Sequence, residues 1–320
     1  TVTYIADRAA ELPQLHANVW ELFEEVKGSK DPEIYEVHLR DADVRNKFYD
    51  RFSLFARTLS LALSSTNFLE TTSPETINKY KADLKFFQNL RAAVTLRYQE
   101  TIDFSEYEPK IKKLIDTHVG AGEVEQLCDP INLLDARERQ QVLEDNSKSA
   151  GAKADMIASA TRHAIEHEMA KDPPFYKKFS KLLEEVIDAY HAGRLQAIEA
   201  LERIKDISTK VVTHTDDEVP YELIGKDMAR RYFGCVREPL AVYAAGNDKP
   251  GADIALQIVG RIALHKIRDW RTNQDAINKM RGEIDDILFE VAEEHGLKLS
   301  LDEQDAIIDR CIEVAIANED

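Results

Sequence analysis

The sequence is short of the residues that interrupt regular structure. Its 320 residues include only 12 glycines and 10 prolines, and these are the residue types on which tight turns between β-strands depend. No segment alternates convincingly between apolar and polar residues. The only candidate for a short strand, residues 210–213, fits the end of a helix better. The scarcity of turn residues and of alternation therefore predicts an all-α fold.

Cysteine and long apolar runs are scarce as well. The three cysteines, Cys128, Cys235 and Cys311, lie far apart and offer no pair of metal ligands. We therefore expect a reduced, cytoplasmic protein. No apolar run approaches the ~20 residues that span a membrane, and no signal-peptide pattern follows Thr1. Because the chain starts at Thr1 and not at a methionine, we expect a fragment or a processed chain.

Acidic residues outnumber basic ones by 59 to 42, which gives a formal net charge of −17. Domains that bind nucleic acid over a broad surface are normally basic. The overall field of this chain therefore repels DNA, and any contact with DNA must come from a local patch. Hydrophobic residues make up 43% of the chain, which is enough to build a core. Taken alone, this composition favours a soluble interaction module.

The most strongly patterned part of the chain runs from residue 79 to residue 119. Ser73 and Pro74 form a helix-start signal, and apolar residues then recur at helical spacing as far as Tyr98. Ser105 and Glu108 fit a capping box that starts a second helix. We predict that the two helices form a central hairpin covered by other helices. The residues expected to face inward are Leu84, Phe87, Leu90, Val94, Ile111, Leu114, Ile115 and Val119.

The same signals predict helices along the rest of the chain. We expect them at about 13–27, 41–63, 135–145, 152–170, 174–193, 196–212, 223–234, 253–270, 274–294 and 302–317. Gly234 is expected to end one helix, and Asp31-Pro32 to break the chain. Asp172-Pro173-Pro174 marks the predicted domain boundary. The predicted architecture is a multi-helix bundle built around the hairpin in a helical domain over 1–171, followed by a C-terminal helical domain over 172–320.

Three long segments resemble one known family. They are DLKFFQNLRAAV (83–94) followed by IDFSEYEPKIKKLIDTHV (102–119), the stretch from Lys153 through DPPFYKKFSKLLEEVI (172–187), and DWRTNQDAINKMRGEIDDILFEV (269–291). Together they resemble the C-terminal helical region of the restriction, or motor, subunit of type I restriction–modification enzymes. The similarity extends from about residue 40 to residue 291 in the family's own order.

This resemblance implies a part of a larger machine. The complete subunit of that family translocates and cleaves DNA using ATP and Mg²⁺, and it docks on a core of modification and specificity subunits. Our sequence has no G-x-x-x-x-G-K-[ST] loop to hold nucleotide phosphates. Glu25-Val26-Lys27 has half of a nuclease pattern, but it lies on an amphipathic helix without a preceding strand-borne acid. We expect no catalytic, cofactor-binding or metal site in these residues, and a docking role onto the modification–specificity core.

Two other functions remain open on the sequence alone. One is a stand-alone helical scaffold or regulatory protein, and the other is a helical nucleic-acid-binding module. The candidates for protein docking are aromatic or arginine residues, the types that anchor interfaces: Phe175, Tyr176, Trp270 and Arg271. For Trp270, closure of the core between the last helices is the simpler interpretation. The candidates for phosphate contacts are Lys110, Lys112 and Lys113.

A second lysine cluster and one histidine pair have simpler explanations. Lys177, Lys178 and Lys181 could contact phosphates, but pairing with acids such as Glu184 is the preferred interpretation. His163 and His167 are one helical turn apart, but the intervening glutamate is not where the zinc-protease order His-Glu-x-x-His requires it. No third metal ligand is indicated.

Overall fold

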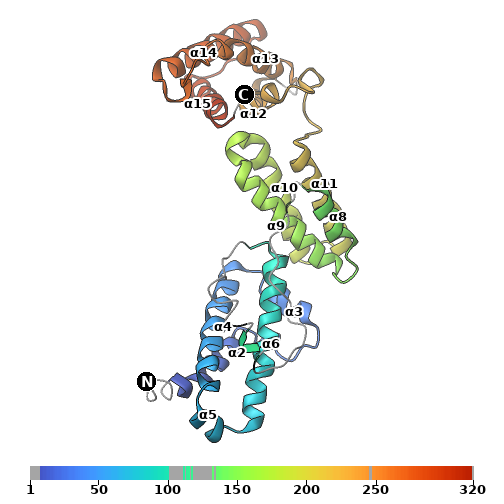
Figure 1. The fold of residues 1–320 in the computed structure, drawn as a ribbon. Helices are drawn as coiled ribbons and strands as arrows, with labels where there is room; N and C mark the ends of the chain where they lie inside the picture. The colour runs from blue at the N-terminus through green and yellow to red at the C-terminus, as the bar shows by residue number, and fades with distance from the viewer. Residues whose placement is uncertain are drawn as a thin grey trace. The chain divides into compact units, whose positions relative to one another are not determined.

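The computed structural model describes residues 8–100, 111, 113–115, 117, 132, 135–244 and 247–318. Every regular element among these residues is a helix (Figure 1), and the all-α prediction is confirmed. The chain divides into two compact units, residues 1–132 and 133–320. The predicted domain boundary at 171/172 lies inside the second unit. None of the described helices has both the length and the apolar character that a membrane span requires.

The described helices of the first unit surround one aromatic core. They are α2 (Leu12–Glu21), α3 (Pro32–His38), α4 (Ala42–Leu63), α5 (Thr66–Thr71) and α6 (Pro74–Arg97). The predicted central helix is α6, and its side chains Leu84, Phe87, Leu90 and Val94 are all buried as expected. Phe87 is surrounded by six other aromatic rings whose centroids lie 5.0–6.4 Å away. This ring cluster holds α2, α4 and α6 together.

The second helix of the predicted hairpin lies mostly outside the described residues. Ile111, Leu114 and Ile115 are buried in the core of the first unit, whereas Val119 is not among the described residues. The hairpin itself therefore stays a prediction. Asp31-Pro32 starts an element instead of breaking the chain, because the Asp31 carboxylate caps α3 and proline is well tolerated in a first helical turn.

The second unit contains two groups of packed helices. The first group consists of α8 (Ala136–Glu144), α9 (Ala150–Glu168), α10 (Pro173–His191) and α11 (Ala197–Thr213). The second consists of α12 (Asp227–Ala244), α13 (Lys249–Ala263), α14 (Gln274–His295) and α15 (Leu301–Ala317). Short 3-10 turns complete the unit: η1 (Met169–Lys171), η2 (Tyr221–Leu223) and η3 (Trp270–Thr272). Ser300 and Glu303 form a capping box at the start of α15.

Some predicted helix ends were wrong. Gly234 does not end a helix but lies in the middle of α12, which continues through Pro239 to Ala244. A Cβ atom at Gly234 would lie 3.1 Å from the Cβ of Pro174. The glycine therefore serves close packing between α12 and the start of α10, and not helix termination. The helix predicted to reach residue 270 also ends earlier, at Ala263.

Candidate functional site

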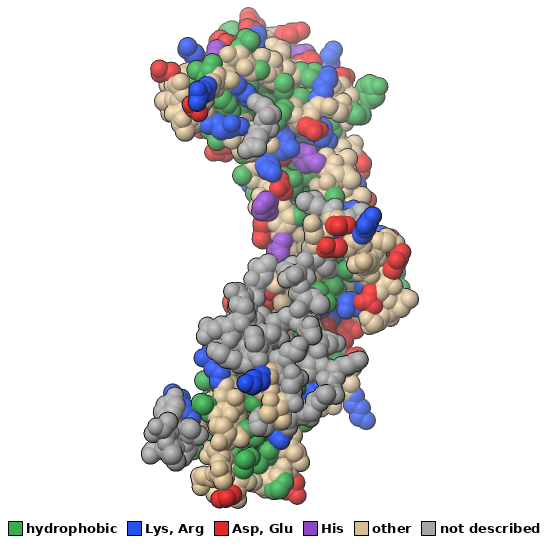
Figure 2. Space-filling model, in the orientation of Figure 1, with side chains coloured by type: hydrophobic (Ala, Val, Ile, Leu, Met, Phe, Trp, Pro, Cys, Tyr) green, Lys and Arg blue, Asp and Glu red, His purple; other side chains and the backbone are tan. Residues whose placement is uncertain are grey.

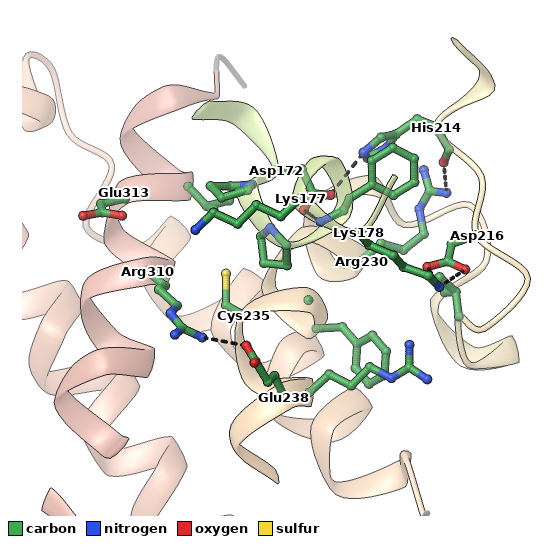
Figure 3. A pocket seen from close by; sticks show the side chains of 18 of the residues that line it. Asp172, Lys177, Lys178, His214, Asp216, Arg230, Cys235, Glu238, Arg310 and Glu313 are labelled. Atoms are coloured by element: carbon green, nitrogen blue, oxygen red, sulfur yellow. Dashed lines mark hydrogen bonds and ion pairs between the residues drawn. The ribbon is translucent and has the colours of Figure 1, made fainter. Parts of the chain in front are cut away.

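The most distinctive surface feature of the second unit is a pocket of about 750 Å³ lined by α10, residues 214–219, α12 and α15 (Figure 3). Six of its lining residues are basic and four are acidic, so that its formal charge is 6 − 4 = +2 with His214 neutral. A positively charged hollow stands out in a chain whose net charge is −17. The basic residues are Lys177, Lys178, Lys181, Arg230, Arg237 and Arg310, and the acidic residues are Asp172, Asp216, Glu238 and Glu313.

Asp172 organises the wall at the start of α10. Its carboxylate accepts a hydrogen bond from the Phe175 amide at 3.2 Å and so caps the helix that Pro173 and Pro174 begin. The other carboxylate oxygen lies 3.1 Å from Nε2 of His214. His214 ends α11 in a left-handed conformation (φ 48°), and its ring lies 4.3 Å from the ring of Phe175. The start of α10 and the end of α11 are therefore joined by a carboxylate–imidazole contact and by a ring contact.

A second group of contacts neutralises part of the positive charge. The Lys178 ammonium donates to both carboxylate oxygens of Asp216 at 2.8 Å and lies 2.9 Å from Glu218. Arg237 donates to the same Glu218 carboxylate at 2.8 Å. A hydrogen bond from Lys178, and to a lesser extent one from Arg237, lowers the pKa of Glu218. Asp216 and Glu218 therefore largely neutralise the charges of Lys178 and Arg237.

The remaining cations on α10 are different. Lys177 is exposed and forms no ion pair or hydrogen bond with any described residue. Lys181 lies one turn further along α10, is 80% exposed, and approaches only Glu185 at 4.0 Å. In Figure 3 the Lys177 side chain extends away from the Lys178–Asp216 pair, toward α15 with Arg310 and Glu313. Arg310 itself lies 3.6 Å from the highly exposed Glu238.

The sequence-predicted site residues are distributed over several places. Phe175 lines the pocket and is half-buried, whereas Tyr176 is buried. Burial, and to a lesser extent the nearby Glu168 carboxylate, raises the pKa of Tyr176 to about 12. Trp270 belongs to the core of the second unit. Arg271 donates to the carbonyls of Ile316 and Asn318 at 3.1 and 2.6 Å, near the end of α15. Their docking role stays a prediction.

The predicted phosphate contacts are only partly visible. Lys110 and Lys112 lie outside the described residues, and Lys113 is exposed. His163 and His167 are both exposed, and no cluster of three or more potential metal ligands occurs among the residues that the structure describes. Glu184, the expected partner of the 177–181 lysines, pairs instead with Arg162 at 2.8 Å.

Several pocket residues were not singled out from the sequence, namely His214, Arg230, Arg237 and Arg310. The only local signal was the spacing of Arg230 and Arg237, which are seven residues apart and so share one helical face. Nothing in the sequence indicates that this face of α12 meets the lysines of α10. The pocket arises from packing between segments that are distant in the chain.

Comparison with known proteins identifies the family. Residues 29–317 match the family described as "Type I restriction enzyme HindI endonuclease subunit-like, C-terminal". The match covers most of the chain, and the chain therefore belongs to this family. It is also 26% identical over 252 residues to a protein named as the MjaIXP type I restriction enzyme endonuclease subunit of Methanocaldococcus jannaschii. That alignment covers 72% of this chain and 22% of the relative's length. No solved structure matches the chain significantly.

Proposed function

We propose that this chain is a non-catalytic helical part of a type I restriction enzyme endonuclease subunit, and that it docks the subunit onto the modification and specificity subunits. The observation that carries the proposal is the family match over residues 29–317 in a sequence without a phosphate-binding loop. ATP and Mg²⁺ would then act elsewhere in the parent subunit. DNA would be bound by the full enzyme and not primarily by this part.

The surface supports a protein partner over DNA. Figure 2 shows basic and acidic side chains interspersed over the visible face of the described residues. A duplex-binding surface needs a continuous stripe of positive charge to match the closely spaced phosphates. With a net charge of −17, long-range attraction to DNA is also missing. A protein interface can accommodate such mixed charges at its polar rim.

A direct test is a pull-down of the purified modification–specificity core with the tagged 320-residue chain, at physiological salt and without DNA. We expect stable capture of the core. The matched control is the core incubated with the tag alone. Failure to capture the core, together with tight binding of duplex DNA that weakens steeply as salt is raised, contradicts the proposal.

The second candidate is a helical module that binds nucleic acid through its cation-lined pocket. The observations that favour it are Lys177, which has no partner among the described residues, and Lys181, which contacts only Glu185 there, at 4.0 Å. Binding of a labelled duplex and a labelled single strand to the same chain distinguishes it from docking. If the chain is a nucleic-acid-binding module, it binds the duplex or the single strand with an affinity that falls steeply as the salt concentration rises.

A further inference from the structure

The cation-lined pocket has two lysines that the described acids neutralise weakly or not at all. Lys177 has no partner among the described residues, and Lys181 approaches Glu185 only at 4.0 Å. By contrast, Lys178 and Arg237 are held by Asp216 and Glu218 at 2.8–2.9 Å. Because Lys177 and Lys181 are one helical turn apart, they present a pair of ammonium groups along one edge of the pocket. The pair can bind two carboxylates, and the only ion pair exchanged among the described residues is the loose, exposed Lys181–Glu185 contact at 4.0 Å.

Apolar surface lies next to these charges. Pro174 and Phe175 line the pocket at the start of α10, and both are only half-buried. Ala241 on α12 lines it as well and is exposed. The volume of about 750 Å³ falls within the range of about 300–1,000 Å³ that is usual for ligand pockets. The pocket is therefore large enough for several side chains, and it offers an apolar surface beside a cationic edge.

We propose that this pocket receives an acidic peptide segment of a partner protein, with carboxylates on Lys177 and Lys181 and an apolar side chain against Pro174 and Phe175. The inference rests on the proposed docking function and names the chemistry of one contact within it. Charge complementarity supplies the attraction and fixes the register of the segment. The apolar side chain supplies the anchor that an interface needs at its centre.

A nucleic-acid backbone fits this pocket less well. A DNA duplex carries a charge about every 3.4 Å along each strand and keeps its bases stacked inside, so it has no apolar face to place against Phe175. Its phosphates would also approach Glu238 and Glu313, which line the same pocket. A peptide can place two carboxylates on Lys177 and Lys181 and keep its uncharged residues beside those acids. The mixture of weakly neutralised cations, acids and apolar surface therefore favours a peptide.

Binding can be measured with the complete chain and a short fluorescein-labelled peptide in which paired aspartate and glutamate residues alternate with leucine. We expect a saturable increase in fluorescence anisotropy that weakens as the salt concentration rises. The double charge reversal Lys177→Glu and Lys181→Glu is expected to weaken binding by about tenfold or more. The control reverses two exposed lysines outside the pocket, Lys279→Glu and Lys298→Glu, with the same change in net charge. The control variant is expected to bind the peptide within about twofold of the unmodified chain.

Both variants are then used in the pull-down of the modification–specificity core. Loss of the core with the pocket variant but not with the control supports the inference. If all three proteins capture the core equally, the docking function stands and the pocket inference is overturned. If the peptide binds the pocket but the core is never captured, the docking function fails and the acidic-peptide site stands. A labelled duplex bound more tightly than the peptide, and lost in the pocket variant only, reassigns the pocket to nucleic acid and overturns the inference.

Discussion

The carboxylate of Asp172 and the imidazole of His214 lie 3.1 Å apart in the second unit. The ring nitrogen and the carboxylate are not aligned as a hydrogen bond, so the two groups meet as a close polar contact. It joins the N-cap residue of α10 to the C-cap residue of α11, and both residues line the cation-lined pocket. The pocket therefore depends on a pair of residues from separate helix ends.

The first prediction concerns this pair. Asp172→Ala removes the helix cap and the contact with His214 together, and we expect it to cost about 2–4 kcal/mol in the free energy of unfolding. Asp172→Asn keeps a side-chain oxygen that can cap α10, so it should cost about 1 kcal/mol less. Urea titrations followed by circular dichroism measure both values. Equal stability of the alanine and asparagine variants would show that the cap contributes nothing.

The second prediction concerns the aromatic core of the first unit. Phe87 is fully buried, and Phe87→Ala is expected to cost about 3–5 kcal/mol. Phe289, on α14, is 66% exposed, and Phe289→Ala should change stability by less than about 0.5 kcal/mol.

The two tryptophans of the chain allow each unit to be followed separately. Trp20 lies in the first unit with its ring 5.0 Å from Phe87, and Trp270 lies in the second. In a Trp270→Phe background, the fluorescence of Trp20 reports unfolding of the first unit alone. A Phe87→Ala midpoint in urea that matches the parent would contradict the burial of this ring.

The periodic helices could be predicted from the sequence because their signals are local. Leu84 and Phe87 recur at helical spacing, and Ser300 carries its own capping box. Gly234 was misread because its role depends on Pro174, which is distant in sequence. The cluster from Lys177 to Lys181 could be recognised because its residues are close in sequence. The pocket could not be recognised, because its walls are distant in sequence. The walls with Arg230, Arg237 and Arg310 come from α12 and α15, and only tertiary packing brings them to α10.

The third prediction tests the close approach at Gly234. In an open helical position, replacing glycine by alanine stabilises a helix by about 0.5–1 kcal/mol. Gly282 in α14 is such a position, because a Cβ atom there would meet nothing within 4 Å. At Gly234 the added Cβ atom would press on the rigid ring of Pro174 at 3.1 Å. We expect Gly234→Ala to be less stable than Gly282→Ala by about 1–3 kcal/mol. Chemical denaturation of the two variants under the same conditions measures this difference.

The fourth prediction is a dependence of stability on alkaline pH. Burial, and after it the Glu168 carboxylate, raise the pKa of Tyr176 to about 12 from an ordinary value of 10.0. The folded state therefore retains the phenol proton at pH values where the unfolded state has lost it. Stability contributed by neutral Tyr176 is constant below about pH 10 and is lost as the pH rises toward 12. The phenylalanine side chain of the Tyr176→Phe variant has no hydroxyl group and does not ionise.

Because the phenylalanine variant lacks this titration, the stability of the unmodified chain should fall relative to Tyr176→Phe across that interval. The expected relative loss is on the order of 1–3 kcal/mol by pH 12. Other tyrosines titrate equally in both proteins and cancel in the difference. A stability difference that stays constant between pH 9 and 12 would mean that the phenol is not perturbed.

The last prediction concerns Cys311, which is fully buried on α15 in the core of the second unit. A side-chain hydrogen bond with Cys235 and burial both raise the pKa of the Cys311 thiol well above its ordinary value. Only the thiolate reacts with alkylating reagents. We therefore expect iodoacetamide at about pH 8 to modify Cys311 much more slowly in the native chain than in urea. Mass spectrometry of the digested chain reads each cysteine separately, and Cys128 lies outside the described residues.

Cys235→Ala removes the largest cause of the pKa shift of Cys311. In that variant Cys311 should react faster than in the unmodified chain, yet still more slowly than in urea because it stays buried. Modification of native Cys311 at the rate seen in urea would place this thiol at the surface and contradict the packing of α12 against α15.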